Sequence, residues 1–357
     1  MDAIQASERS ESGDPDRSPL ANRLLVQIPA NRAEEFWYLG ADYGAGIVVS
    51  GGQALSAVSL HKEELAQRPV MVDRRRYAGA KRPSGTTLFT QSWIQTQRQM
   101  RLPVVLTDSG YVGRADRSAL VAILEQTVRA GTEVTAVLPL SASWLADDEV
   151  KHLIGEINQH RVPVALVLEH TADPLATQWA VRGLKHLLEQ ARPAVSLLCT
   201  DLSGIGALAH GAAWVAVGVT SSLRHLYPAD RPGPPYGTLP TKYAIVPRLL
   251  SFMRVERILE GWAHTQQHDD LVEDLWRCAC AECGNRTMDR FATCADVSLA
   301  AHNASVLDDL QQQVTSPASW ASAIDGALGW YQWIEDEYHL IWEPPRFMNA
   351  WLPRSQR

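Results

Sequence analysis

Three cysteines and a histidine near the C-terminus have the spacing of a metal site. Cys278, Cys280 and Cys283 form a Cys-x-Cys-x-x-Cys segment, and His302 follows downstream. The chain has only five cysteines, so three of them within six residues are a strong local concentration. Thiolate and imidazole groups are the ligands that zinc prefers, and four of them complete its tetrahedral shell. The spacing therefore predicts a zinc ion bound by these four side chains.

The predicted set of ligands is closed, which indicates a structural site. A tight turn would bring Cys278 and Cys280 to one ion, and a following helix would supply His302. Four protein ligands leave no position open to a substrate. Two alternatives stay open at this point. Cys294 is able to take the place of His302, or the cysteines are simply buried thiols, since cysteine is often buried.

A second group of candidates consists of carboxylates that follow apolar runs. Asp108 lies in a Thr-Asp-Ser-Gly turn, and Asp201 lies in the similar stretch Thr-Asp-Leu-Ser-Gly. On a barrel of parallel strands both carboxylates would lie at the same mouth, where such enzymes place their chemistry. The pair would then serve as nucleophile and acid/base. The alternative for each is a turn that caps the next helix, which for Asp201 would begin at Ser203.

The elements that must position these residues are short apolar runs separated by helix-like segments. Helical spacing of apolar residues is visible over 118–130, 147–160 and 175–191. Continuous apolar strands that alternate with helices are typical of a parallel sheet covered by helices. We therefore expect an irregular (β/α)8 TIM barrel with one strand hidden, and a doubly wound open sheet is the main alternative. The runs are Ile47–Ser50, Pro69–Asp73, Pro103–Asp108, Val134–Leu140, Val162–Glu169, Ala194–Asp201 and Trp214–Thr220.

Changes in composition divide the chain into three parts. Residues 1–20 are polar and charged, so we expect a disordered tail. The barrel is assigned to 21–240, with the globular pattern starting at about Glu34. A proline-rich stretch over 228–240 marks its end. Residues 241–357 are expected to form a zinc-binding helical part packed on the barrel, with the first segment, up to residue 277, helical.

The charge balance limits how the protein would contact nucleic acid. The 357 residues carry a formal net charge of −7, so no global basic field surrounds the chain. A local cluster of basic residues after one strand is suited to binding phosphate groups, although a solvated loop is the simpler interpretation. The first twenty residues are polar and the longest apolar stretch contains several glycines, so we expect a cytoplasmic protein without a membrane partner. The cluster consists of Arg74, Arg75, Arg76, Lys81 and Arg82.

The Thr-Asp-Ser-Gly turn and the cysteine–histidine cluster together resemble the tRNA-guanine transglycosylase family. His302 is followed by Asn303, which is similar to the family's His-Asn pairing. The resemblance spans roughly Val70 to Leu310, with clear identity confined to the two motifs. It implies an irregular barrel with a structural zinc subdomain. It also implies exchange of a guanine in nucleic acid for a 7-deazaguanine.

The resemblance assigns roles to residues at the barrel mouth. It implies that Asp108 contacts the base and handles protons, with Ser109 and Gly110 lining the base pocket. Glu169 stands where the family has a Gln-Gly-Gly strand end. Arg224 lines up with an arginine that follows the family's nucleophilic aspartate. Both residues are therefore predicted to bind substrate.

The chain departs from the family at the nucleophile. With Arg224 aligned, the position of the attacking aspartate holds Gly218, which has no side chain to attack with. The first turn continues with Tyr111 instead of glycine, and 139–140 is Pro-Leu where the family has a base-contacting aspartate. Asp201 is then the candidate replacement nucleophile.

Three functions follow as expectations. The first is base exchange on guanine or 7-deazaguanine in nucleic acid, with Asp108 and Asp201 as catalytic residues. The second is a non-catalytic protein that binds nucleic acid or a modified base. The third is an N-glycosidase in which Asp108 or Glu169 activates water. The expected partners are a tRNA or DNA and a small nucleobase, and a homodimer or heterodimer is left open.

Overall fold

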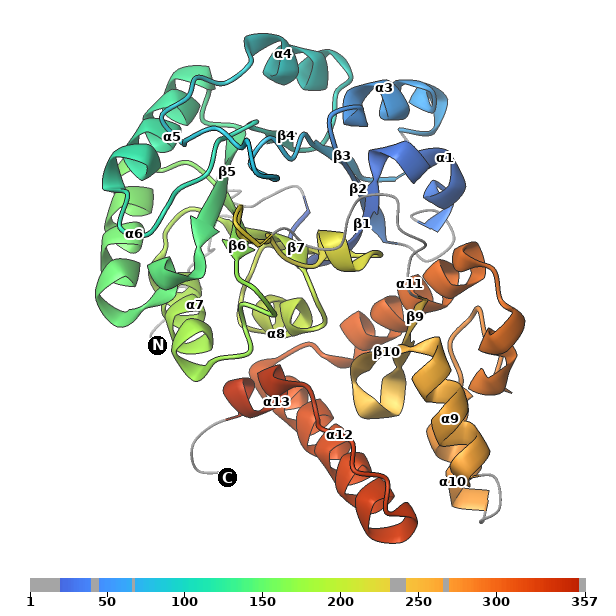
Figure 1. The fold of residues 1–357 in the computed structure, drawn as a ribbon. Helices are drawn as coiled ribbons and strands as arrows, with labels where there is room; N and C mark the ends of the chain where they lie inside the picture. Colours follow the sequence, from blue (N-terminus) through green and yellow to red (C-terminus); the bar gives the residue numbers. More distant parts are fainter. Residues whose placement is uncertain (1–19, 40–44, 66–67, 232–241, 266–269, 353–357) are drawn as a thin grey trace, which may run out of the picture.

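A nearly closed barrel of eight parallel strands forms the body of the protein (Figure 1). The computed structural model describes residues 20–39, 45–65, 68–231, 242–265 and 270–352. The strand order is β3-β2-β1-β8-β7-β6-β5-β4, so the chain runs around the barrel in sequence and β1 pairs with β8. The strands are β1 (Arg23–Pro29), β2 (Gly46–Ser50), β3 (Val70–Asp73), β4 (Val105–Leu106), β5 (Val134–Ser141), β6 (Val164–Glu169), β7 (Val195–Thr200) and β8 (Trp214–Gly218).

The barrel is interrupted between β3 and β4, the two ends of the strand order. These strands lie next to each other, but no ladder is formed between them. Strand β4 is only two residues long and pairs with β5 alone, which makes this part of the barrel irregular. The circular order of the strands fits the predicted TIM-like barrel. A doubly wound sheet would instead reverse its order at a central strand.

Strand β1 is the strand that the sequence pattern hid. It begins at Arg23, so the expectation that the globular part starts near Glu34 was wrong. The reason is Gln27, a polar residue that breaks the apolar run although it is fully buried in the barrel. Its side chain donates to Ser50 Oγ at 2.7 Å and accepts from the backbone N–H of Cys199 at 2.7 Å. Buried polar groups are tolerated when they are paired in this way.

Helices cover the outside of the barrel, as Figure 1 shows. Helix α5 illustrates why they form. Asp116 caps its first turn by accepting from Ala119 N–H, and Gly131 ends it with φ of 137°. Its buried residues fall on one face, which packs on the strands. The helices around the barrel are α1 (Ala33–Phe36), α3 (Ala54–Ser59), α4 (Gln91–Gln99), α5 (Arg117–Ala130), α6 (Asp147–His160), α7 (Gln178–Gln190) and α8 (Ser203–Ala209).

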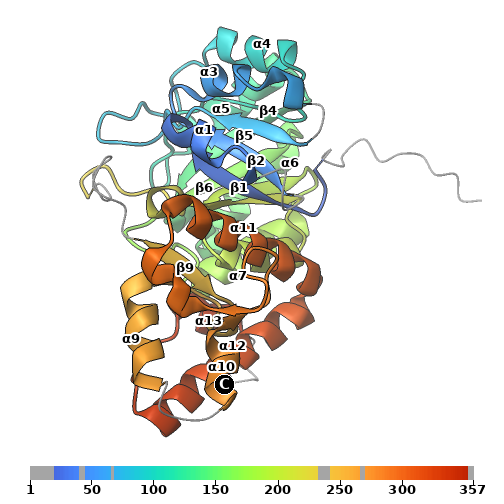
Figure 2. The same ribbon diagram turned by 90° about the vertical axis from the view of Figure 1, so that its right-hand side faces the viewer.

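All eight strands point the same way, so their C-terminal ends form one mouth. Figure 2 shows the segment after β3 and the segment after β8 projecting from the same side of the barrel. In Figure 1 the mouth therefore faces the viewer. The side chains that follow the strand ends are brought to this side, as the sequence pattern predicted for a barrel.

The C-terminal part consists of a β-hairpin, two short strands and five helices, placed beside the barrel (Figure 1). The prediction of a helical segment up to residue 277 holds over Val255–Thr265 and Asp270–Trp276. Tyr243–Val246 and Ser251–Arg254 instead pair as an antiparallel hairpin. Leu250 turns the chain with φ of 45° between the two strands. The elements are β9 (Tyr243–Val246), β10 (Ser251–Arg254), α9 (Val255–Thr265), α10 (Asp270–Trp276), β11 (Arg277–Cys278), β12 (Arg286–Thr287), α11 (Asp296–Gln313), α12 (Pro317–Tyr338) and α13 (Arg346–Trp351).

This part shares a continuous hydrophobic core with the outer layer of the barrel. Gln311 of α11 accepts from Leu24 N–H of β1 at 3.0 Å, and Trp320 of α12 packs directly on Gly206 of α8. The predicted tail over 1–20 lies outside the described residues except for Leu20, which is buried. The predicted boundary at residue 240 also lies outside them. Among the described residues, no helix is long and apolar enough to cross a membrane.

Two glycines in neighbouring helices test the packing around the barrel. A Cβ on Gly183 of α7 would overlap the carbonyl oxygen of Leu145, whereas a Cβ on Gly155 of α6 would meet nothing within 4 Å. We expect Gly183→Ala to lower the free energy of unfolding by about 2–4 kcal/mol because the helix must move away. Gly155→Ala should raise it by up to about 1 kcal/mol through helix propensity. Urea unfolding measures both, and equal midpoints would contradict this packing.

Candidate functional site

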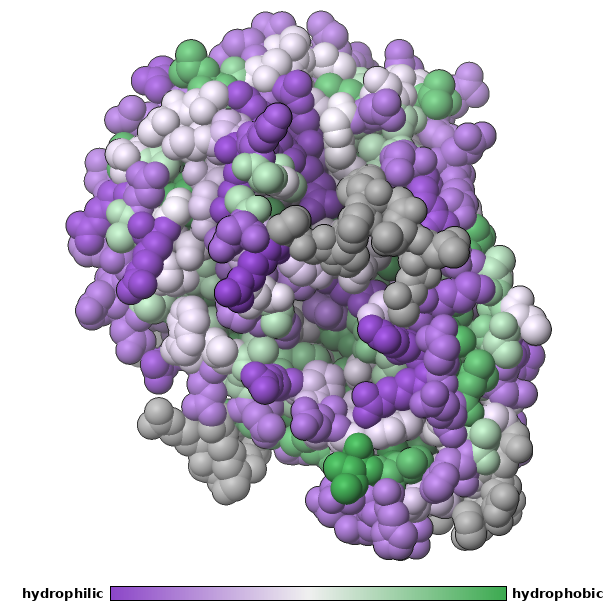
Figure 3. Space-filling view, in the orientation of Figure 1, coloured by the Kyte–Doolittle hydropathy of each residue, from purple (hydrophilic) through white to green (hydrophobic). Residues whose placement is uncertain are grey.

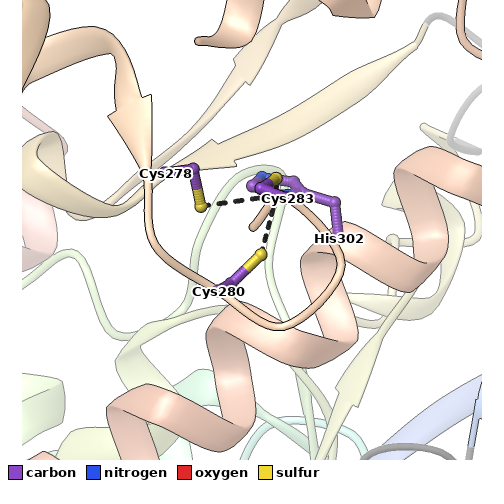
Figure 4. Close-up of side chains that lie close together, drawn as sticks. All are labelled: Cys278, Cys280, Cys283 and His302. Carbon is purple, nitrogen blue, oxygen red and sulfur yellow. Dashed lines mark hydrogen bonds between the residues drawn. The ribbon is translucent and has the colours of Figure 1, made fainter. Parts of the chain in front are cut away.

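Four side chains of the C-terminal part converge on one point, as predicted (Figure 4). Cys278 ends β11, Cys280 and Cys283 lie in the turn that follows, and His302 projects from α11. The turn is closed by the N–H groups of Cys283 and Gly284, which both donate to Cys280 O. The Nδ1 atom of His302 lies 3.8, 3.6 and 3.1 Å from the three sulfur atoms in chain order. All four residues are buried, and their ligand atoms lie within 4.8 Å of one another.

The surroundings of His302 prepare its ring for metal binding. Its Nε2 lies 2.8 Å from the carbonyl oxygen of Ile245, which can only accept, so Nε2 carries the proton. The lone pair of Nδ1 then faces the three sulfur atoms. Asn303 fixes the same strand, because it accepts from Ile245 N–H at 2.7 Å and donates to Tyr243 O at 3.1 Å. The His-Asn pair thus fastens α11 to β9 and orients the ring.

Arg290 lies beside the sulfur atoms. Its Nη2 donates to Cys283 Sγ at 2.8 Å and its Nη1 to Cys294 Sγ at 3.7 Å. A divalent ion with three thiolates and a neutral imidazole would carry one net negative charge, which is unfavourable in a buried site. The guanidinium offsets that charge from the second shell. Cys294 is not part of the converging group, so the arrangement favours His302 as the fourth ligand. The four side chains are able to hold one metal ion.

At the barrel mouth, Asp108 is held by protein groups on both of its oxygens. Arg74 Nη1 lies 2.6 Å from Oδ2, and the backbone N–H of Thr90 donates to Oδ1 at 2.9 Å. Arg76 lies 3.7 Å from the same Oδ2. The side chain of Asp108 is fully buried. The carboxylate therefore orders the segment between β3 and α4, in addition to ending β4.

The rest of the Thr-Asp-Ser-Gly turn also faces protein. Ser109 Oγ lies 2.7 Å from Thr107 Oγ1, and both side chains are buried. A Cβ on Gly110 would overlap the carbonyl oxygen of Ser84, so this glycine allows the segment from β3 to pass close to the turn. The predicted base-pocket role of Ser109 and Gly110 stays a prediction.

Glu169 ends β6 in an ion pair with Arg82 and accepts a hydrogen bond from the Tyr111 hydroxyl. The Arg82 guanidinium lies 3.4 Å from the centroid of the Tyr111 ring. Burial and the bond to Glu169 raise the pKa of Tyr111 well above its ordinary value. Glu169, Arg82 and Tyr111 therefore join the strand end of β6 to the segments that follow β3 and β4.

Asp201 lies on another part of the mouth, with Asp173 and Arg224. All three line one small cavity beside the ends of β6 and β7, and Asp108 is not among the residues that line it. Burial, with a smaller effect from the charge of Asp201, raises the pKa of Asp173 to about 7. The Asp201 carboxylate accepts from Leu202 N–H at 2.7 Å just before α8.

Arg224 closes the other side of this cavity. Its guanidinium is buried and lies 3.5 Å from the centroid of the Phe252 ring of the C-terminal part. Its Nε donates to Gly218 O at 3.2 Å. Burial lowers the pKa of Arg224, and the charge of Asp201 opposes that shift. Asp201 and Arg224 are therefore brought together, whereas the structure shows no contact between Asp201 and Asp108 among the described residues.

The position aligned with the family's nucleophile is closed by backbone. A Cβ on Gly218 would lie 2.5 Å from both the carbonyl carbon and the oxygen of Leu223. No side chain fits there unless the turn after β8 moves.

A buried polar network inside the barrel was missed by sequence reasoning. Asp73 accepts from the Tyr77 hydroxyl at 2.7 Å and from Ser50 Oγ at 3.3 Å, and burial raises its pKa. Cys199 lies 3.3 Å from the Gln27 amide nitrogen, with φ of 53°, a strained value for a residue other than glycine. Polar residues inside apolar runs were the signal for this network. Asp173, far from any strand core, gave no comparable signal.

Comparison with known proteins adds no relative to this picture. No protein-family model matches the sequence, and no curated protein matches it. Membership of the tRNA-guanine transglycosylase family therefore stays a prediction that rests on the two motifs.

The raised pKa of Asp173 predicts a dependence of stability on pH. Between about pH 4 and pH 7 the unfolded chain loses this proton while the folded protein keeps it, so folding becomes less favourable as pH rises. Asp173→Asn removes this effect and keeps an acceptor for Leu175 N–H. We expect the variant to be more stable than the wild type by about 2 kcal/mol at pH 8, half of the full effect because the side chain is partly exposed.

The difference between the two proteins should shrink on acidification and vanish near pH 4. Urea unfolding of both proteins across this range measures it. A gap that is constant with pH, or wider in acid, would show that Asp173 does not hold its proton in the folded protein.

Proposed function

We propose that the protein binds a purine base of a nucleic acid at the mouth of the barrel, without a covalent intermediate on residue 218. The observation that carries this proposal is the turn at Gly218, which leaves no room for a nucleophilic side chain. The resemblance to base-exchanging enzymes supplies the class of ligand. The closed turn removes the step that would make exchange possible by their route.

The state of the other carboxylates supports binding over catalysis. Asp108 is neutralised by Arg74, and Glu169 by Arg82. A carboxylate that must take a proton from water or from a base needs a free lone pair, and the oxygens of these two are engaged in ion pairs and hydrogen bonds. They instead hold arginines in fixed positions around the mouth.

Arg74 and Arg76 share the single carboxylate of Asp108, so this segment keeps a local positive charge within an acidic chain. Arg74 and Arg76 keep 35% and 26% of their side chains exposed beside Asp108. Lys81 is exposed on the same segment. Figure 3 shows that this face of the protein is mainly hydrophilic, with hydrophobic residues in separate small patches. Such a surface is suited to phosphate contacts around one recognised base.

A second candidate is base exchange or base release with Asp201 as the reacting carboxylate. It is favoured by one observation, the pKa of about 7 for Asp173 beside Asp201, which suits an acid/base group at neutral pH. In that case Asp201 attacks the anomeric carbon, or activates a water that does so, while the bond from that carbon to the base breaks. Asp173 donates its proton to the departing base. The two candidates differ in whether a covalent adduct or a free base is formed.

The protein should therefore bind nucleic acid without forming a covalent adduct or releasing a base. We expect the protein to bind a guanine-containing RNA stem-loop or the matching DNA, measured by fluorescence anisotropy, with affinity that falls as salt rises. Lys81→Glu should weaken binding several-fold and make the salt slope less steep by about 1. Lys62→Glu is the matched control, an exposed lysine on the segment that returns to the start of β3, away from the mouth.

Denaturing gels and base analysis on the same mixtures decide between the candidates. We expect no adduct and no free base. An adduct that Asp201→Asn abolishes would establish base exchange, and free base without an adduct would establish hydrolysis. Absence of binding to either nucleic acid would refute the proposed function.

We further propose that the metal held by Cys278, Cys280, Cys283 and His302 is zinc, in a structural role. Three thiolates and one imidazole are a typical structural zinc set, and soft sulfur ligands disfavour magnesium and calcium. The imidazole is oriented by β9 and the sulfur charge is offset by Arg290, which are second-shell features of such sites. A bound ion would tie β11 and the turn after it to α11.

Two cysteines contacted by the same arginine provide a matched test. Cys283→Ser should lose most of the bound zinc and lower the melting temperature, because a ligand is removed. Cys294→Ser should keep about one zinc ion per chain. Metal analysis of the purified proteins measures the outcome. If Cys294→Ser loses zinc as completely as Cys283→Ser, His302 is not the fourth ligand.

A further inference from the structure

An exposed leucine stands on the basic segment at the barrel mouth. Leu88 is 73% exposed and is one of four large hydrophobic residues that are exposed in the described part of the chain. It lies between β3 and α4, the segment that also carries Arg74 and Arg76. Single exposed hydrophobic residues are common on protein surfaces. What distinguishes Leu88 is its place on a basic segment beside the candidate site.

The backbone on both sides of Leu88 is firmly held. The carbonyl oxygen of Leu88 accepts from Arg76 Nη1 at 2.9 Å. The N–H of Phe89 donates to Gln126 of α5 at 3.0 Å, and the N–H of Thr90 donates to Asp108 at 2.9 Å. These backbone hydrogen bonds fix the segment with Leu88 exposed and the next residue, Phe89, buried.

The neighbours of Leu88 are charged. Arg76 bonds its carbonyl and also approaches Asp108, and Arg74 bonds both Asp108 and the Thr90 hydroxyl. The other exposed large apolar residues of the described chain, Leu60, Val128 and Ile341, lie on other elements. A protein partner would call for an apolar patch around Leu88. A single apolar side chain among guanidinium groups instead matches a nucleic acid, which offers phosphates for the arginines and base faces for the leucine.

We infer that Leu88 is a wedge that enters the base stack and occupies the place left by the base that turns into the mouth. This inference rests on the proposed function. Proteins that unstack bases commonly insert an apolar side chain such as leucine, and a base reaches a concave site only after it leaves the stack. The hydrogen bonds of Asp108 and Arg76 to residues 88–90, with Arg74 bound to Asp108, fix the backbone that carries this leucine beside the mouth.

The test uses a guanine-containing RNA stem-loop with 2-aminopurine beside the guanine, because 2-aminopurine becomes brighter when it unstacks. Binding is followed by anisotropy and unstacking by fluorescence in the same titration. Wild type should raise the fluorescence on binding. Leu88→Ala should lose more than about half of that rise at saturation while its affinity falls only a few-fold, since the phosphate contacts remain. Leu88→Met should keep the rise, because it keeps an apolar side chain of similar length.

Leu60→Ala is the matched control, a leucine that is 79% exposed on the segment that leads back to β3. It should behave as the wild type in both measurements. A full fluorescence rise with Leu88→Ala at saturation would overturn the wedge and leave the proposed binding intact. Loss of anisotropy change in the wild type would refute the proposed function, and the wedge with it.

Discussion

The structure depends on one constraint, that charges buried at the end of a nearly closed barrel must be paired. Parallel strands bring their C-terminal ends to one mouth, where the chain places carboxylates, arginines and a thiol in a small space. An unpaired charge there would be strongly unfavourable. Asp108 with Arg74 and Glu169 with Arg82 satisfy this requirement by ion pairs. Asp73 is instead hydrogen-bonded and keeps a raised pKa.

The same constraint operates in the C-terminal part. Three buried sulfur atoms would repel one another as thiolates, and a cation between them relieves that repulsion. Arg290 lies on the outer side of Cys283, where it offsets the charge that one divalent ion leaves over. The hydrogen bonds of His302 and Asn303 to β9 place the imidazole before any ion binds. The sulfur cluster is thus tied to the hairpin, and the hairpin carries Phe252, on which the mouth residue Arg224 packs.

How far the sequence predicts this structure depends on how local each signal is. The cysteine cluster was recognised because its ligands are close in sequence and chemically distinctive. Strand β1 was missed because Gln27 interrupts its apolar run, and only the assembled barrel supplies the partners that make this glutamine acceptable. The hairpin before α9 was taken as helix, since its pairing and the turn at Leu250 are not visible in apolar spacing.

The carboxylates at the mouth also depend on contacts between residues that are far apart in the sequence. Their position after strands was predicted correctly, but position does not state which partner each one faces. Asp108 and Asp201 both follow barrel strands, yet one is bound by Arg74 and the other shares a cavity with Asp173 and Arg224. The partner of each carboxylate depends on which arginine side chains from other loops reach it. The spacing of residues in the sequence does not predict these long-range contacts.

The cysteine–histidine cluster and the barrel mouth differ in how much the fold depends on each side chain. A structural cluster needs all four ligands, since removal of one leaves buried sulfur without compensation. A nucleophile is different, because its loss removes a reaction and leaves the fold intact. At Gly218 the backbone of Leu223 occupies the space that a Cβ would need, and Arg224 donates to Gly218 O. To accept an aspartate at this position, the turn after β8 would have to open and Arg224 would have to leave Gly218 O. The mouth is therefore built around a glycine at this position, and the proposed binding of a base without a covalent intermediate rests on that feature.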